Sequence, residues 1–435
     1  MSATQTIDVA QLKVGMFVHL DLGWWAHPFA LSSFQIASAD QITTIQGLKL
    51  KQVRWSPDKS VLPEEVVAAP SGHAAGTTQT APAADVRLTE DPAARAADQR
   101  RADLAAQRSA AQLCERQHAE AARAWKQATE LLVPEPARAR EAAEGLAQAL
   151  VDKMLGAGDV CLRVLSEHLG DRAAAHALNV SVVALLMGRA CGLRDEELTA
   201  LGTGTLLHDI GKLEIPDRVR HADSLSTASE IALYRDHVIK GIAQGKRMGL
   251  GEDAMAILAQ HHEMADGSGF PARASGERIA VPARIAALVN RYDNLCNPAM
   301  PSHALTPHEA LSLIFAQSKS KFDAALLNAF IRLMGVYPPG SVVQLTDDRY
   351  ALVVNVNAAR PLKPRVLVHD PKVPADEALL LNLESEPDLG IRRSVKPAQL
   401  PAAAHDYLQP RQRMVYFFEP APAVAVDADA EALAA

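Results

Sequence analysis

The chain has 435 residues, of which 48% are hydrophobic and 4% are aromatic. Lysine and arginine number 44 and aspartate and glutamate 51, so the formal net charge is −7 at pH 7. This balance excludes the broad basic surface of a protein that wraps DNA, and so few aromatic residues argue against stacking along single-stranded nucleic acid. The four cysteines are far apart and form no Cys-x-x-Cys pair, which argues against a disulfide framework or a zinc knuckle.

The N-terminal segment lacks the basic and apolar stretches of a signal peptide. No uninterrupted apolar run reaches the ~18 residues that a membrane helix needs. The richest stretch, residues 177–188, contains Asn179 and Ser181, and Arg189 follows it. We therefore expect a cytoplasmic protein without a membrane span.

Residues 6–60 contain short β-branched and aromatic runs that are separated by Gly15, Gly23 and Gly47. This pattern predicts a small N-terminal domain with strands, residues 1–65, of α+β or all-β type. Trp24 and Trp25 are expected in its core, with a binding surface for a protein partner as the alternative.

Residues 66–90 are rich in alanine, proline, glycine and threonine, which predicts a disordered linker. Residues 91–150 are rich in alanine and straight-chain residues, so we expect two long helices that are separated near Pro134 and Pro136. They form either a helical spacer or a stalk that dimerises or transmits a signal. The second alternative is compatible with a homodimer.

Residues 151–335 show helical spacing of apolar residues, first at Val160, Val164 and Leu165, and then in 178–187, 257–258 and 285–289. We expect an all-α domain of at least six helices. Three strand-like runs follow residues 338–340, which predicts a small β appendage at 336–410, and residues 411–435 are expected to form a mostly flexible tail. The predicted fold class is multidomain and mainly α, with a small N-terminal strand-containing domain and a small C-terminal β appendage.

Histidines and carboxylates recur in order through the helical domain. One histidine on a helix is usually a surface residue or a core residue with its hydrogen bonds satisfied, but an ordered series predicts a metal centre. Mixed imidazole and carboxylate ligands suit first-row metals such as manganese or iron, and two metals ~3.5–4 Å apart are a known solution for phosphoryl hydrolysis. The series consists of His176, His208, Asp209, Lys212, His237, His261 and His262.

The motifs HDIGK at 208–212, HHEMADGSGFP at 261–271 and RYDNL at 291–295, with single histidines before and after HDIGK, resemble the HD-GYP family of the HD phosphohydrolase superfamily. The resemblance covers roughly residues 155–340. Residues 6–60 are similar to the small domain of unknown function that often precedes it. The resemblance implies an HD-type helical bundle that uses two or three metals to hydrolyse the bacterial second messenger cyclic di-GMP.

The resemblance also assigns roles to individual residues. One of two divalent ions, iron or manganese, would be held by His176, His208 and Asp209, and the other by Asp209, His237, His261 and His262. Asp209 and Lys212 are the predicted catalytic residues, and Lys212 would contact the scissile phosphate. The pocket mouth and substrate site would be shaped by Lys212, Asp266, Gly267, Gly269, Phe270 and Pro271, with phenylalanine in place of the family's tyrosine.

Three positions depart from the family pattern. Asn290 stands at the closing metal ligand, where an aspartate is usual, so the site loses a charge that Asp293 on the same face partly replaces. Arg172 stands where trinuclear members carry a glutamate, so a third metal is not expected. Residues 299–302 lack the phosphate-binding Arg-Pro-Tyr-Arg-like run. The function predicted is a cyclic di-GMP phosphodiesterase, or alternatively a catalytically degenerate receptor or scaffold that still binds nucleotide or metal; purely structural histidines are a third reading.

Overall fold

The computed structural model describes residues 4–20, 33–48, 50–60, 92–156, 158–166, 171–220, 227–317, 319–357 and 360–421. The predicted linker at 66–90, the pair Trp24 and Trp25, and residues 422–435 of the predicted tail lie outside these ranges. The chain divides into two compact units, residues 1–105 and residues 106–435.

The first unit contains a four-stranded antiparallel sheet in the order β1-β4-β2-β3. Its side chains Val18, Ile36 and Ile45 are almost fully buried. The Ser38 side chain accepts a hydrogen bond at the helix N-terminus, where polar residues satisfy free backbone N–H groups. The predicted strand-containing domain is confirmed and is of α+β type. Its elements are β1 (Gln5–Asp8), β2 (Phe17–His19), β3 (Ser33–Gln35), α1 (Ala39–Gly47) and β4 (Gln52–Ser56).

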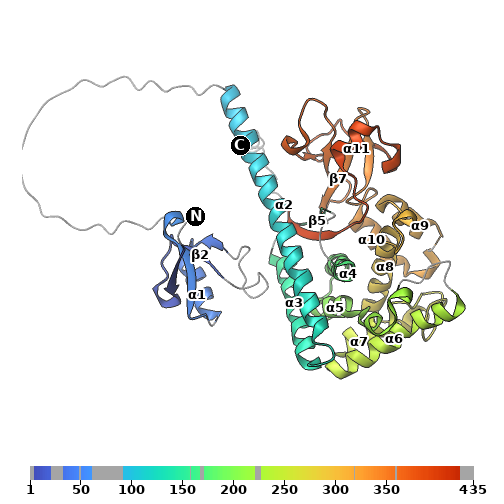
Figure 1. The fold of residues 1–435 in the computed structure, drawn as a ribbon. Coiled ribbons are helices and arrows are strands. Elements are labelled where there is room, and N and C mark those ends of the chain that lie inside the picture. The colour runs from blue at the N-terminus through green and yellow to red at the C-terminus, as the bar shows by residue number, and fades with distance from the viewer. Residues whose placement is uncertain are drawn as a thin grey trace, which may run out of the picture. The chain divides into compact units, whose positions relative to one another are not determined.

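Two long helices occupy the region predicted as a spacer, α2 (Pro92–Glu130) and α3 (Pro136–Gly156). Figure 1 shows α3 running beside α2. The Lys153 ammonium donates to the Gln117 side chain at 2.6 Å, and the Trp125 indole donates to the carbonyl oxygen of Leu206 at 2.7 Å. From residue 106 onward these helices therefore belong to the second unit, in which Trp125 of α2 and Leu150 of α3 are buried. A role of the two helices as a stalk that dimerises or transmits a signal stays a prediction.

In the described residues of the second unit, seven further helices precede the C-terminal sheet. They are α4 (Arg172–Ala190), α5 (Asp195–Leu207), α6 (Ala228–Met248), α7 (Glu252–Gln260), α8 (Val281–Cys296), α9 (Pro307–Gln317) and α10 (Ala324–Met334). The helix α4 packs against both α5 and α8. By length and composition it could cross a membrane, which differs from our expectation, but 72% of its apolar window is buried inside the unit, as in a core helix.

A seven-stranded antiparallel sheet follows, with the path β10-β6-β7-β5-β11; off this path β8 pairs with β7, and β9 pairs with β8. Figure 1 shows it beyond the ends of α4 and α10. The helix α11 (Ala402–Leu408) lies between its last two strands in the chain. The strands are β5 (Val160–Val164), β6 (Val342–Leu345), β7 (Tyr350–Asn357), β8 (Arg365–Val368), β9 (Leu381–Asn382), β10 (Ile391–Ser394) and β11 (Tyr416–Pro420).

Two predictions about this sheet were wrong. Residues 160–164 form β5 and not a helix, so residues 151–335 are not all-α. A short apolar segment has no period long enough to distinguish helix from strand. Residues 416–420 form β11 within the predicted tail, and its Phe417 and Phe418 are buried. The two strands pair with each other, so the β appendage draws on segments that lie before and after residues 336–410.

Candidate metal centre

The centre forms where several helices end. Leu207 is the last residue of α5, His208 caps it, and Asp209 comes next, before a 3-10 turn at Ile210–Glu214. A Cβ atom at Gly211 would collide with the carbonyl oxygen of His237 and would lie 2.5 Å from the backbone nitrogen of Gly241. Only glycine lets this turn pack so closely on α6, and the packing brings Asp209 near His237.

The structure brings the predicted histidines and aspartate together in two groups that share Asp209. Within each group the ligand atoms all lie within 4.8 Å of one another. They come from four helices or helix ends that are far apart in the chain. The groups are His176, His208 and Asp209, and Asp209, His237, His261 and His262.

Each carboxylate oxygen of Asp209 faces a different group. Oδ2 lies 3.3 Å from Nε2 of His176 and 3.4 Å from Nε2 of His208. Oδ1 lies 3.4 Å from Nε2 of His237 and 3.7 Å from Nε2 of His261. This is the arrangement that a carboxylate needs to bridge two cations.

The other ring nitrogens fix the orientation of the imidazoles. His208 Nδ1 donates to the carbonyl oxygen of Thr205 at 2.7 Å, His237 Nδ1 to that of Tyr234 at 2.6 Å, and His261 Nδ1 to a carbonyl of α7 at 3.1 Å. Because a carbonyl oxygen only accepts, each Nδ1 carries the proton. The lone pairs on Nε2 therefore point into the centre, where they can bind metal.

Asp293 orients the fourth imidazole. Its Oδ2 accepts from His176 Nδ1 at 2.6 Å, and its Oδ1 accepts from the side chains of Asn179 at 2.7 Å and Asn297 at 2.8 Å. We expected Asp293 to compensate for Asn290 as a metal ligand. The arrangement argues against this, because three hydrogen-bond donors already occupy the Asp293 carboxylate. The Oδ1 of Asn290, one turn earlier in α8, accepts from the Asn294 side chain at 2.6 Å.

The electrostatics of Asp209 suit a cation. Burial would raise the pKa of this carboxyl, but Lys212 and His208 outweigh burial and hold it well below its usual range. The Lys212 ammonium lies 2.6 Å from Oδ2. Oδ1 is buried and has no hydrogen-bond partner among the described residues. An unpaired anionic oxygen beside imidazole lone pairs is the donor set that a divalent first-row metal takes, so the residues fit the metals that the sequence predicts.

The imidazoles of His237, His261 and His262 are uncharged at neutral pH. Burial lowers the pKa of His237 to about 4, and burial holds the pKa values of His261 and His262 well below their usual range. At His176 burial also lowers the pKa, but hydrogen bonds to Asp209 and Asp293 outweigh burial and raise it to about 9, so this imidazole carries a proton near pH 7 that a bound metal would displace. Neutral histidines are the form that binds metal.

The sequence analysis missed Tyr234. Its ring lies 5.3 Å from the Lys212 ammonium, and its hydroxyl lies 3.5 Å from Nε2 of His262. Tyr234 is three residues before His237 in α6, and residues at this spacing share a helix face. That spacing is the signal that identifies it.

The loop that we predicted at the pocket mouth, residues 266–271, has two parts with different surroundings. The Phe270 ring stacks on His262, with ring centroids 4.5 Å apart, and a Cβ at Gly269 would lie 2.5 Å from the backbone nitrogen of Met264. These residues line the second group of ligands. Asp266 is exposed and accepts from the Ser268 backbone, so it shapes the loop itself. Gly267 adopts a φ of +75°, which favours glycine, and Pro271 is exposed.

Comparison with known proteins agrees with this geometry. Residues 160–326 match the family model described as HD domain, and residues 4–143 match a domain of unknown function, DUF3391. The chain contains an HD domain. The resemblance found in the sequence is confirmed, and the HD domain includes α4 to α8 and thus all seven predicted metal ligands.

Several relatives of this HD-domain chain have named activities. A cyclic di-GMP phosphodiesterase of Pseudomonas aeruginosa is 27% identical over 372 residues, which are 83% of this chain and 84% of that protein. A cyclic di-GMP phosphodiesterase response regulator of Xanthomonas campestris is 32% identical and aligns with 35% of this chain and 41% of its own. A 3'3'-cGAMP-specific phosphodiesterase of Vibrio cholerae is 30% identical and aligns with 36% of this chain and 30% of its own.

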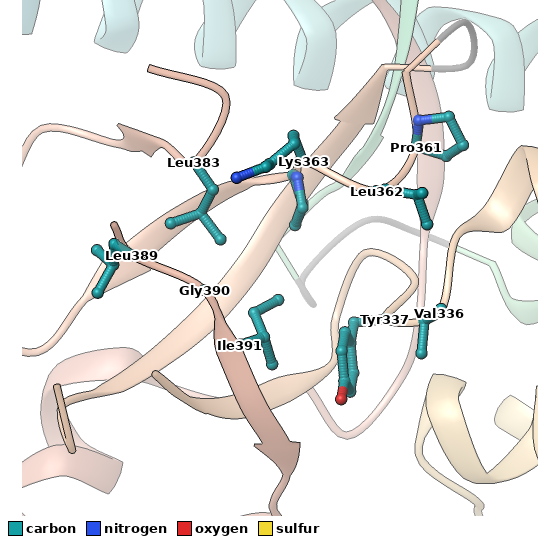
Figure 2. Close-up of a pocket in the computed structure, with 10 residues that line it drawn as sticks. Val336, Tyr337, Pro361, Leu362, Lys363, Leu383, Leu389, Gly390 and Ile391 are labelled. Atoms are coloured by element: carbon teal, nitrogen blue, oxygen red, sulfur yellow. The ribbon is translucent and has the colours of Figure 1, made fainter. Parts of the chain in front are cut away.

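A cavity of about 450 Å³ opens beside the HD-domain histidines and is reached by Lys212. Its walls include Trp125 of α2, Arg172 of α4 and Arg413 of the segment before β11. A second cavity, of about 160 Å³, lies in the C-terminal sheet, and Figure 2 shows the mostly apolar side chains around it. His176 and Asp209 line the first cavity, which therefore gives access to them.

Proposed function

We propose that this chain is a metal-dependent phosphodiesterase that hydrolyses cyclic di-GMP in bacterial second-messenger signalling. The observation that carries the proposal is the position of Asp209, with one carboxylate oxygen toward each group of Nε2 atoms. The names of relatives that are 27% to 32% identical support the choice of substrate.

The proposed ligands follow from the two groups. One metal would be held by His176, His208 and Asp209, and the other by Asp209, His237, His261 and His262, with iron or manganese as the ions. Asn290 is proposed as a weak additional ligand. When bound, a pair of such cations lowers the pKa of a water molecule and neutralises charge on phosphoryl oxygens.

The chain's own residues would stabilise developing charge and hold the ligands in position. The Lys212 ammonium remains charged, because Asp209 outweighs the effect of burial and raises the pKa of Lys212. It lines the cavity and can offset charge that develops on the phosphate or on the leaving oxygen. Phe270 holds the His262 ring in place by stacking on it.

The proposal extends to the setting of the enzyme. We propose that it acts in the cytoplasm, that the N-terminal unit binds a protein partner, and that the chain forms a homodimer. Size-exclusion chromatography with light scattering tests the last point directly.

The test of the proposed function uses the full chain loaded with Mn²⁺ or Fe²⁺. We expect near two metal equivalents and hydrolysis of cyclic di-GMP, with 3'3'-cGAMP and bis(p-nitrophenyl) phosphate as comparison substrates. Asp209→Ala should abolish turnover and remove at least one metal equivalent. A metal-loaded wild type that binds cyclic di-GMP without cleaving it would instead identify the degenerate receptor, which Asn290 and residues 299–302 favour.

A further inference from the structure

Two arginines line the cavity beside the metal centre. Arg172 begins α4, and Arg413 lies in the segment before β11. Among the residues that the structure describes, neither forms an ion pair. Guanidinium groups in a cavity are suited to anions, and to phosphates in particular, because their planar N–H groups match phosphate oxygens.

Arg172 is held in place by backbone. Its guanidinium donates to the carbonyl oxygens of Asn297 at 3.1 Å and Ala299 at 3.3 Å. Burial and the nearby Arg413 lower the pKa of Arg172 by more than the Asp293 carboxylate raises it, so the two guanidinium charges lie close enough to repel each other. An anion between them would remove that repulsion.

The Arg413 side chain is exposed, but the backbone next to it is hydrogen-bonded to side chains at two helices of the bundle. The next residue, Met414, donates its N–H to the Asn297 side chain at 2.8 Å and accepts at its carbonyl from Asn179 at 2.8 Å. The C-terminal segment is therefore fixed between α4 and α8. This places Arg413 at the cavity although it is more than 200 residues from the HDIGK motif.

We propose that Arg172 and Arg413 bind the phosphodiester of cyclic di-GMP that is not being cut. The inference rests on the proposed function, because it takes the substrate to be a cyclic dinucleotide. Such a substrate carries two phosphodiesters. While one lies at Asp209 and Lys212, the other must occupy another part of the same cavity. Residues 299–302 supply no arginine for it, and the carbonyls of this region hold Arg172 instead.

The test compares binding and turnover in the metal-loaded full chain. Binding is measured with a non-hydrolysable phosphorothioate analogue of cyclic di-GMP, and turnover with cyclic di-GMP and with bis(p-nitrophenyl) phosphate, which has one phosphate. Arg172→Ala and Arg413→Ala should each weaken analogue binding by about tenfold, since a hydrogen bond to a charged group contributes on this scale. The fall in kcat/KM should be at least fivefold larger for cyclic di-GMP than for the small diester.

Controls separate this inference from folding and from the proposed function. Arg123→Ala removes an exposed arginine of α2 that does not line the cavity, and it should leave binding and both rates unchanged. Arg413→Ala removes no hydrogen bond or ion pair with the residues that the structure describes, so its result stands even where Arg172→Ala disturbs the end of α8. If both variants bind the analogue within twofold of wild type, or if Arg123→Ala weakens binding equally, the inference is overturned. A wild type that binds the analogue but cleaves no cyclic di-GMP contradicts only the proposed function.

Discussion

The carboxylate of Asp293 lies 2.6 Å from Nδ1 of His176, whose other nitrogen points toward Asp209. A carboxylate behind a ligating imidazole fixes the ring and raises its basicity, and loss of such a partner typically costs 10–100-fold in metal affinity. Asp293→Asn should therefore weaken one of the two metal equivalents by roughly that factor. A competition titration against a chelator measures it. Asp152→Asn, on the exposed side of α3, is the matched control, and equal affinities in all three proteins would contradict the role of Asp293.

Gly211 sets the distance between the HDIGK turn and α6. Because a Cβ there would meet backbone atoms of α6, Gly211→Ala should destabilise the fold by at least roughly 2 kcal/mol and separate Asp209 from His237. Urea denaturation and metal analysis measure the two effects. Gly145→Ala is the matched control: its Cβ would meet no atom within 4 Å in the interior of α3, and it should add roughly 0.5–1 kcal/mol of stability. Similar values for both variants would argue against the close packing.

Asn290 offers a neutral oxygen where a carboxylate is usual in the family. Asn290→Asp keeps the shape of the side chain and adds a charge beside the predicted cations, so metal binding should tighten and turnover should rise. The Asn294 amide that now donates to Asn290 Oδ1 can donate equally to a carboxylate. Calorimetric titration with Mn²⁺ and initial rates measure the change. Weaker binding in the variant would show that Asn290 is not at the metal.

His118 makes folding sensitive to acid. It is buried in α2, neither ring nitrogen has a hydrogen-bond partner in the described ranges, and burial lowers its pKa from 6.5 to about 4. Between these values the unfolded chain binds the extra proton and the folded chain does not. The free energy of unfolding therefore falls as the pH drops from about 6.5 to about 4, by up to roughly 3 kcal/mol.

His118→Leu should remove this dependence and leave stability at pH 7.5 equal or higher, because no hydrogen bond is lost. Denaturation at several pH values, with wild type and variant compared at each, isolates this one group from the other histidines. Parallel stability curves for the two proteins would contradict the assignment.

The ligand residues could be predicted from the sequence because the motifs are local: His208 and Asp209 adjoin at one helix end, and His261 and His262 at another. The strand β5 could not, since residues 160–164 become a strand only by pairing with residues 416–420. Nothing within five residues of Val160 indicates that partner. The same long-range pairing places Arg413 at the cavity. The sequence around residues 299–302, which lacks an arginine, therefore gives no sign that Arg413 lies nearby.

Because β5 pairs with β11, the folded unit extends beyond the end of the HD-domain match. The HD-domain match ends at residue 326, yet Asn179 in its central helix accepts a hydrogen bond from the backbone of Tyr416 at 2.8 Å. A fragment trimmed to the matched range would expose both edges of β5 and leave that buried amide without its partner. Expression work should therefore keep residues 106–421 together, and a protease that cuts after α10 should inactivate the enzyme even though every histidine survives.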